Sequence, residues 1–486
     1  MAGVGIRLNR IFEKHSLMAD FVGFAYGTAI TVAPMLLVIL DILLMGRALD
    51  FDSLGFLDRE LFSCTILYIF IFALLTTSPF NAVLSKYMHD VIFEERYDDI
   101  LPCYYIGMLL TVCLGCLLAV PFCLWEYFVG GVAVFYVFTG FCGYMSLVLA
   151  FYSMIYLLVC KDYQLISIFF LVGLVVAFFE ALFLRFVLHW SIPFSMLFSL
   201  VTGFFLIAVL EFATIRRYFR KNSNRYKNVL VYFRKSWQLV VINFFYTLGL
   251  YIHNFVFWTT DMRLVIVKSF VCNQPYDMAT CLAMFTNISA TVIFIARVEM
   301  HFHERYKAYS EAVIGGKAAD IENTKQRMFR KLSGELMSLV RIQFIISVTI
   351  FLLCIVILPQ VGFAGMIMRI YPCLAAGYFI LFIMYAEILF LYYFKDMTGA
   401  VITTLSFCLV TFLGSLAAVH LNEIWYGIGL WLGAFVGWTI AYMRIRRMEK
   451  HLTAFIFSQG TLIKYKKGRM PSSMVYCRHE EDTDRH

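Results

Sequence analysis

The sequence predicts an all-α, polytopic membrane protein with about 12 transmembrane helices in two six-helix lobes. Of its 486 residues, 62% are hydrophobic and only 15% are charged, and the mean hydropathy is +0.79. A soluble domain cannot keep that much apolar surface out of water. Apolar runs of about 18 residues or more recur along the chain, whereas the strands of a membrane barrel would alternate over about ten residues.

These apolar runs place six helices on each side of a short basic segment. In the first half the expected spans are residues 18–45, 61–83, 100–124, 132–159, 163–188 and 192–215. In the second half they are residues 237–258, 277–296, 342–358, 371–394, 397–419 and 426–443. The chain therefore divides into a first lobe (1–215), a linker (216–236), a second lobe (237–443) and a tail (444–486).

A short internal repeat favours two lobes of the same orientation. Met88-His89 is followed by Glu95-Arg96-Tyr97, and Met300-His301 is followed by Glu304-Arg305-Tyr306. Each copy follows the second expected helix of its half. Such parallel repeats are related by an axis along the membrane normal.

The distribution of positive charge predicts that both termini lie in the cytoplasm. With the N-terminus inside, 34 of the 40 Lys and Arg residues fall in inner segments and six in outer ones. Cytoplasmic loops carry such an excess, so we expect a multi-pass protein of the cytoplasmic membrane. The net charge of +8 then belongs to a rim facing anionic membrane lipids and does not indicate a nucleic-acid partner.

Two basic segments are candidates for docking a cytoplasmic partner. Residues 216–235 contain eight basic residues and no acidic one, and residues 297–341 contain nine basic residues in the longest inner loop. The alternative is that these charges only set the orientation. The docking candidates are Arg216, Arg217, Arg220, Lys221, Arg305, Arg327, Arg330 and Lys331.

Charged or polar groups at membrane depth are candidates for a substrate or ion pathway, because they are costly to keep there. Glu180 and Glu387, one from each lobe, are the first candidates, and an interhelical hydrogen bond is the structural alternative. Asp41 lies close enough to the interface to be simply hydrated, and His253 is of a type often found as a packing residue. Arg185 lies five residues after Glu180, a spacing that points the two side chains in different directions.

Enzymatic and metal-binding patterns are absent from the sequence. There is no Gly-x-Ser-x-Gly, His-Glu-x-x-His or Gly-x-x-x-x-Gly-Lys motif, and no loop is long enough for a soluble catalytic domain. Cys113 and Cys116 form one Cys-x-x-Cys within an apolar run, without a second pair at zinc-site spacing. We therefore expect neither catalysis nor a cofactor or metal.

Three stretches resemble the PelG family of Pel exopolysaccharide export subunits. Met1-Ala2-Gly3-Val4-Gly5-Ile6-Arg7-Leu8 is similar to the family's opening Met-Ala-Gly-Ile-Gly-Phe-x-Leu, with conservative changes at two positions. The stretch from Phe257-Trp258 to Lys268 resembles the family's loop after the seventh helix, and the stretch from Arg297 to Tyr306 resembles its following inner segment. The similarity extends from residue 1 to about residue 465.

The resemblance implies membership of the multidrug/oligosaccharidyl-lipid/polysaccharide (MOP) flippase superfamily, with a central cavity and alternating access. It also implies export of a hexosamine-rich exopolysaccharide in a biofilm setting, with a cytoplasmic glycosyltransferase and other membrane subunits of the Pel system as partners. The alternatives are a membrane scaffold for the polysaccharide synthase, or a lipid-linked oligosaccharide or multidrug antiporter of the same superfamily. No substrate-binding residue can be carried over from the family.

Overall fold

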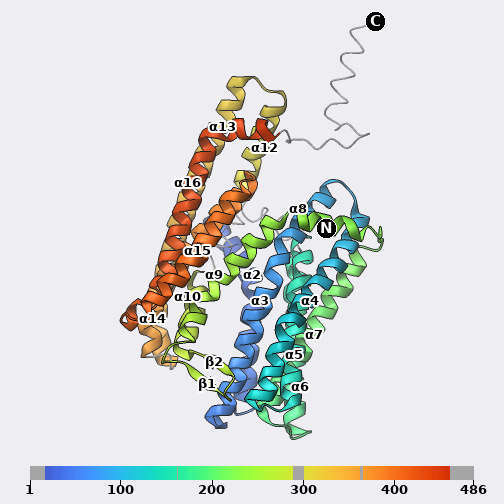
Figure 1. The fold of residues 1–486 in the computed structure, drawn as a ribbon, viewed down its shortest axis with the longest axis vertical. Helices are drawn as coiled ribbons and strands as arrows, with labels where there is room; N and C mark the ends of the chain where they lie inside the picture. Colours follow the sequence, from blue (N-terminus) through green and yellow to red (C-terminus); the bar gives the residue numbers. More distant parts are fainter. Residues whose placement is uncertain (1–16, 161, 288–299, 362–364, 460–486) are drawn as a thin grey trace.

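The computed structural model describes residues 17–160, 162–287, 300–361 and 365–459, and nearly all of them are helical (Figure 1). The first lobe consists of α2 (Leu17–Ala48), α3 (Phe56–Phe93), α4 (Ile100–Trp125), α5 (Val134–Val159), α6 (Tyr163–Phe186) and α7 (Ile192–Tyr218). The linker forms the short helix α8 (Tyr226–Lys235). The second lobe consists of α9 (Trp237–Phe257), α10 (Gln274–Asn287), α12 (Met300–Gly315), α13 (Ala318–Ile357), α14 (Met366–Tyr393), α15 (Met397–Ala418) and α16 (Ile428–Gln459).

Ten of the described helical segments are long and apolar enough to cross a membrane, which confirms the predicted class of fold. They coincide with ten of the 12 predicted spans. The first predicted span corresponds to α2, and the eighth begins in α10 and runs into residues outside the described part of the chain. The count of 12 therefore stays a prediction.

Several helices extend beyond the spans that the sequence predicts. α3 begins five residues before residue 61 and ends ten residues after residue 83, and α16 ends 16 residues after residue 443. α13 begins at Ala318, well before its apolar span at residue 342, as the charged, helix-prone and proline-free run of residues 307–337 predicts. Hydropathy locates the part of a helix that lies in lipid and does not register a polar extension, because α-helix formation continues through helix-forming polar residues.

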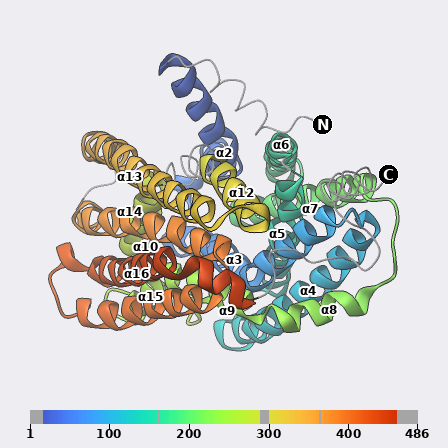
Figure 2. The same ribbon diagram turned by 90° about the horizontal axis from the view of Figure 1, so that it is seen from above.

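Each lobe has its own hydrophobic core. Buried side chains of α2 to α8 form one cluster, and buried side chains of α9 to α16, joined by Val83 of α3, form another. The two lobes meet mainly where α3 packs along α9, near the middle of the view in Figure 2. The chain is thus two packed bundles joined along one pair of helices.

Small residues bring neighbouring helices of each lobe into close contact. A Cβ atom on Gly203 of α7 would lie 2.8 Å from the backbone oxygen of Gly173 in α6. In the second lobe, a Cβ on Gly429 of α16 would lie 2.4 Å from the backbone nitrogen of Ser415 in α15. Lipid supplies no hydrophobic drive for helix association, so close backbone packing of this kind stabilises membrane bundles.

The two ends of the bundle differ, and we name them by what they carry. The "hairpin end" carries the antiparallel hairpin of β1 (Leu264–Ile266) and β2 (Phe270–Cys272), at the bottom of Figure 1. The "basic end" carries α8, α12 and the start of α13, at the top of Figure 1. The ribbons of the two lobes diverge toward the basic end.

Two residues of the hairpin turn have left-handed backbone conformations. Val267 and Lys268 both have positive φ, at 49° and 64°. Such angles match the twist of a tight hairpin but are unfavourable for a β-branched residue. A Cβ atom on Gly130 would lie 2.4 Å from Ser269 Oγ and 3.2 Å from the backbone oxygen of Val267. Only glycine therefore allows the turn to lie directly against the end of α4.

Candidate functional site

Aromatic rings from both lobes stack between α3 and α9 near the hairpin end. Tyr68 of α3 lies parallel to Trp258, which directly follows α9, with ring centroids 5.0 Å apart and planes inclined by 6°. One turn along, Phe72 and Phe255 stack at 6.0 Å and 15°. We call these four side chains the seam. Stacked aromatic pairs contribute more than their buried area alone.

The β1–β2 hairpin is hydrogen-bonded to the first lobe beside the seam. The Tyr68 hydroxyl donates to the backbone oxygen of Val271 at 2.7 Å and accepts from the Val271 N–H at 3.2 Å. Ser269 Oγ donates to Glu126 Oε2 at 2.7 Å, from the hairpin turn to the π-helical turn Glu126–Gly130 that follows α4. The hairpin thus contacts both α3 and the end of α4.

A buried carboxylate anchors the same hairpin to the second lobe. Asp277 of α10 accepts hydrogen bonds from Asn254 Nδ2 at 2.7 Å and from Trp258 Nε1 at 3.0 Å. It also accepts from the backbone N–H of Asn273, the residue that follows β2, at 3.1 Å. Sequence reasoning placed Asp277 only as the start of a helix. Asn254 and Trp258 lie four residues apart on one helical face, and this spacing was the available signal.

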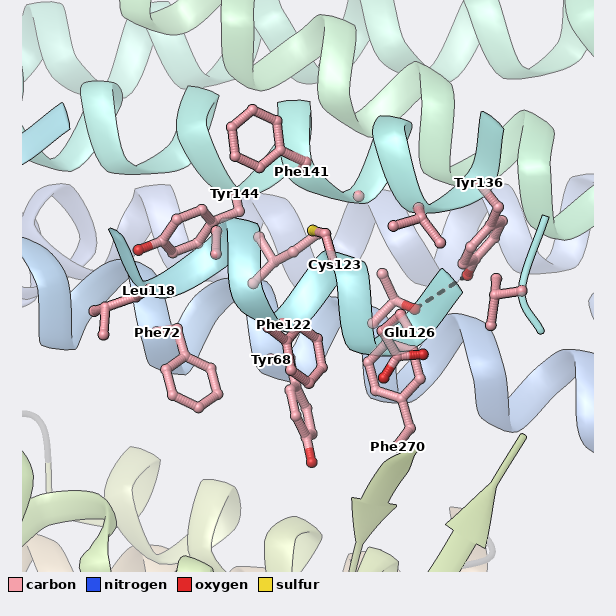
Figure 3. A pocket seen from close by; sticks show the side chains of 16 residues that line it. Tyr68, Phe72, Leu118, Phe122, Cys123, Glu126, Tyr136, Phe141, Tyr144 and Phe270 are labelled. Carbon is pink, nitrogen blue, oxygen red and sulfur yellow. Dashed lines mark hydrogen bonds between the residues drawn. The ribbon is translucent and has the colours of Figure 1, made fainter. Parts of the chain in front are cut away.

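A cavity of about 240 Å³ lies beside the seam within the first lobe (Figure 3). It is bounded by α3, α4 and α5, and Phe270 of the hairpin closes one side. Its lining is mostly aromatic and aliphatic and includes Phe72, Leu118, Phe122, Tyr136, Phe141 and Tyr144. Glu126 supplies a carboxylate that is 2% exposed, and within the described residues its Oε1 has no hydrogen-bond partner.

This cavity suits an apolar group better than a sugar ring. The Tyr136 hydroxyl is already bonded to Thr65 Oγ1 at 3.2 Å, and the Tyr144 hydroxyl to Thr76 Oγ1 at 2.6 Å. A saccharide needs many polar partners, because each buried hydroxyl without a hydrogen bond is costly. A chain of sugars therefore has no matching set of donors and acceptors here.

The structure places Glu180 and Arg185 at two different local contacts of α6. Glu180 is partly buried, and its Oε1 accepts a long hydrogen bond of 3.4 Å from Thr202 of α7. The Arg185 guanidinium donates to the backbone oxygen of Trp190 at 3.0 Å, in the loop before α7. The two side chains thus have separate partners, and their role in a pathway stays a prediction.

The pathway candidates of the second lobe are both buried. Glu387 of α14 is 3% exposed, and its Oε1 accepts from Trp438 Nε1 of α16 at 3.1 Å. His253 is fully buried, and its Nδ1 pairs with the Tyr276 hydroxyl at 2.8 Å. Asp41 of α2 is also buried, and within the described residues its Oδ2 has no partner. These candidates are dispersed over both lobes and do not form one cluster.

Sequence reasoning missed the most isolated carboxylate of the first lobe, Glu211 of α7. It is fully buried, and within the described part of the chain neither carboxylate oxygen has a hydrogen-bond partner. The signal that could have found it is its place seven residues after Phe204, on the inward face of α7.

Four of the predicted docking residues surround one hollow of about 770 Å³ at the basic end. Arg305 comes from α12, and Arg327, Arg330 and Lys331 come from α13. Glu335 lies at the same hollow and pairs with Lys331 at 2.7 Å. In the described residues, no ion pair joins the three arginines to a carboxylate. The hollow therefore has a net positive charge.

The other four docking candidates lie around the linker and are exposed: Arg216, Arg217, Arg220 and Lys221. The Arg216 guanidinium also donates to the Tyr105 hydroxyl of α4. The linker is held on the first lobe by α8, where the Tyr232 hydroxyl donates to Asp90 at 2.6 Å. Burial and the Asp90 carboxylate raise the pKa of Tyr232 well above its usual range, so this phenol remains a donor.

Comparison with protein families gives one match over nearly the whole chain. A family model described as "PelG: Putative exopolysaccharide Exporter (EPS-E)" matches residues 1–457. None of the curated proteins matches the sequence.

Solved structures with the same fold are transporters. An outward-facing multidrug resistance MATE family transporter of the MOP superfamily is 12% identical, with 89% of this chain and 96% of that chain covered and a TM-score of 0.59. An inward-facing multidrug resistance MATE family transporter of the MOP superfamily is also 12% identical. The match covers 87% of this chain and 96% of that chain, with a TM-score of 0.59. A MOP superfamily transporter from Pyrococcus furiosus, whose binding pocket is described as having reverse polarity, is 14% identical. The match covers 88% of this chain and 96% of that chain, with a TM-score of 0.58. At these identities the likeness shows the fold alone.

Proposed function

Because the chain belongs to the PelG family of exopolysaccharide exporters, we propose that it moves a hexosamine-rich, Pel-type polysaccharide across the cytoplasmic membrane by alternating access between its two lobes. The observation that carries this proposal is the seam. Two bundles with separate cores are joined near the hairpin end by stacked rings and by a hairpin anchored in both. Such an arrangement can close one end while the lobes move apart at the other.

The test of export is a gene deletion complemented by seam variants. Cells without the gene should lose extracellular hexosamine polymer, and the wild-type gene should restore it. Trp258→Ala removes a stacked ring and a donor to Asp277 together, so it should lower secretion at an unchanged level of membrane-inserted protein. Full secretion with Trp258→Ala would contradict a gating role for the seam.

The basic end faces the cytoplasm in this proposal, and the hairpin end faces outward. The 34 basic residues of the expected inner segments support this orientation. Cysteine introduced at Lys268 of the hairpin should react with a membrane-impermeant maleimide in intact cells, and cysteine introduced at Lys450 of α16 should react only after lysis. The reverse pattern would overturn the orientation.

The basic hollow and the linker serve, in this proposal, to recruit the cytoplasmic glycosyltransferase that supplies the polymer. The net positive hollow favours an acidic surface on that partner. The variant Arg327→Glu/Arg330→Glu/Lys331→Glu should release the partner while the protein stays in the membrane. Arg447→Glu/Lys450→Glu reverses exposed charges on α16, outside the hollow, and is the matched control.

Co-purification at physiological salt separates docking from a role in topology alone, because exposed charges are screened as salt increases. If the triple variant still co-purified with the partner, the docking role would be wrong, and these charges would only set the orientation in the membrane. A membrane scaffold that does not itself move sugar is the second candidate, and the basic hollow is the observation that favours it. It would be supported if the triple variant lost secretion and seam variants kept it.

Glu180 and Glu387 serve in this proposal as pathway carboxylates that bind sugar hydroxyls or a coupling proton. Each keeps one carboxylate oxygen without a partner in the described residues, at a depth where that is costly. Glu180→Gln and Glu387→Gln keep shape and hydrogen bonding but remove the charge, so each should lower secretion. Thr202→Val is the control, since it removes the donor to Glu180 and keeps the carboxylate. Full secretion from the double Gln variant would reduce both residues to packing roles.

A further inference from the structure

Three residues at successive turns of α3 face β2 and the start of α10, two residues after it. Glu60 Oε1 accepts from Gln274 Nε2 at 3.3 Å, and the Tyr68 hydroxyl bonds Val271. Between them, four residues from each, lies Cys64, which packs in the same small buried cluster as Cys272. The strand therefore runs along one face of α3 and places the two thiols opposite each other.

Both cysteines point into the same small core. Cys64, Ile266, Phe270 and Cys272 form a separate buried cluster, in which the two cysteines are 2% and 3% exposed. Ile266 and Cys272 face inward because side chains alternate along the paired strands. Both thiols are free in this structure.

The two thiols belong to different lobes. Cys64 lies in α3 of the first lobe. Cys272 ends β2 and is followed by Asn273, whose side chain donates to the backbone oxygen of Phe257 in α9 at 3.4 Å and whose N–H donates to Asp277. A covalent bond between the thiols would therefore join the lobes at the seam.

We propose that Cys64 and Cys272 form a redox-active pair whose disulfide locks the hairpin end closed. The inference rests on the proposed orientation, because the outward side of the cytoplasmic membrane is the oxidising side. The oxidant is a thiol–disulfide oxidoreductase or a small disulfide in that compartment. This site has no part in the pathway or the docking surfaces proposed above.

The chemistry is two successive exchanges. When the hairpin lifts, the Cys272 thiolate attacks the oxidant's disulfide, forming a mixed disulfide and releasing one oxidant thiolate. When the hairpin returns, the Cys64 thiolate attacks the sulfur of Cys272, forming the Cys64–Cys272 bond and releasing the second oxidant thiolate. Two protein thiols thus become one disulfide, and the oxidant's disulfide becomes two thiols, with their protons transferred to water and to the leaving thiolates.

Locking follows from the geometry of the bond. A disulfide fixes its two Cα atoms within a few ångströms, so α3 and β2 could no longer separate. Alternating access needs that separation, and the oxidised exporter would stop until a reductant restored the thiols. Cys113 and Cys116 are both on α4 and could not join the lobes in this way.

The experiment uses the full-length protein in membranes and in detergent, with oxidised glutathione as the oxidant. Trypsin cleaves after Arg59 and Lys86 and after Lys268 and Arg297, so mass spectrometry without reductant should find peptides 60–86 and 269–297 joined. Cys64→Ser should abolish the joined peptides. Cys281→Ser is the matched control, because Cys281 lies in the same second peptide, and it should leave them joined.

Secretion gives the functional measurement. Oxidised glutathione should lower polymer output several-fold in wild-type cells, dithiothreitol should restore it, and Cys64→Ser and Cys272→Ser cells should be insensitive to both. Absence of the joined peptides in detergent, where both ends are accessible, would overturn the pairing. Joined peptides with unchanged secretion would overturn the lock. Joined peptides in detergent but not in intact cells would refute the proposed orientation and leave the pairing of the two cysteines standing.

Discussion

The hairpin end and the basic end of this molecule are held in different ways. At the hairpin end the lobes share directional contacts, with Tyr68 stacked on Trp258 and bonded to Val271. At the basic end α12 and α13 pack on each other, and the linker helix α8 is bonded to the first lobe. The basic end carries exposed positive charge, and the hairpin end carries shape-matched rings.

In the transport cycle proposed above, this difference favours the hairpin end as the gate. Stacked rings and bonded backbone groups depend on position within fractions of an ångström, so they either fit or separate. Like charges around a hollow repel one another and are satisfied by a partner or by water. In that proposal the hairpin end separates and closes again, and the basic end binds the cytoplasmic partner.

Of the variants that test this comparison, Gly130→Ala should have the largest effect on stability and secretion. The added methyl would lie 2.4 Å from Ser269 Oγ and 3.2 Å from the Val267 oxygen, so Ser269 must rotate away from Glu126 or the hairpin turn must shift. We expect a loss of about 2–3 kcal/mol in the free energy of unfolding, as for overpacked core positions, and a strong loss of secretion. Gly55→Ala is the control, because its Cβ would meet no atom within 4 Å. Equal stability of both variants, measured by thermal unfolding in detergent, would contradict the close contact.

Glu211→Met should have the next largest effect and the opposite sign. A fully buried carboxylate without partners is costly, and Met has a similar volume, so the variant should gain about 1–3 kcal/mol in the free energy of unfolding. We expect secretion to fall, because a carboxyl group kept at such cost indicates use. Glu211→Gln keeps the shape and isolates the charge. Full secretion from both variants would show that the carboxylate is dispensable.

Tyr68→Phe should have a smaller effect on stability and tests how the hairpin is held against the first lobe. It keeps the ring stacked on Trp258 but removes both hydrogen bonds to Val271, so the loss should be about 1–2 kcal/mol. Tyr136→Phe is the matched control, since it removes one hydroxyl contact within the first lobe, to Thr65. Tyr68→Phe should make cysteine introduced at Ser269 react faster with maleimide, and Tyr136→Phe should not. Equal rates in the two variants would mean that the hairpin is held by packing alone.

The fold was largely predictable because hydropathy identifies the apolar helices that cross a membrane. The predicted start at residue 237 agrees with the start of α9, and residues 397–419 agree closely with α15. The polar extension of α13 from Ala318 lies outside the hydropathy signal, but the charged, helix-prone and proline-free run of residues 307–337 predicts it. Pairs such as Lys331 and Glu335 add to its stability.

The site was predictable only in part, because its contacts are distant in sequence. Eight basic residues were expected as docking candidates, and the structure brings four of them together at one hollow, Arg305 with three residues of α13. The contact of Tyr68 with Val271 joins residues 203 positions apart, and the three-residue strands are too short to show a period. Gly130 looked like an ordinary loop glycine until the turn of the hairpin was placed against it.

Gly334→Ala should have the smallest effect and tests the basic end directly. Gly334 lies in α13 at the edge of the basic hollow, and a Cβ there would meet no atom within 4 Å. Ala favours a helix over Gly by about 0.8–1 kcal/mol, so the variant should be slightly more stable. The methyl leaves the charges of Arg330 and Lys331 in place, so binding of the cytoplasmic partner and secretion should be unchanged. If Gly334→Ala lowered secretion as Gly130→Ala is expected to do, the basic end would also need a close fit or a hinge at this glycine, and the contrast between a shape-matched end and a charged end would be wrong.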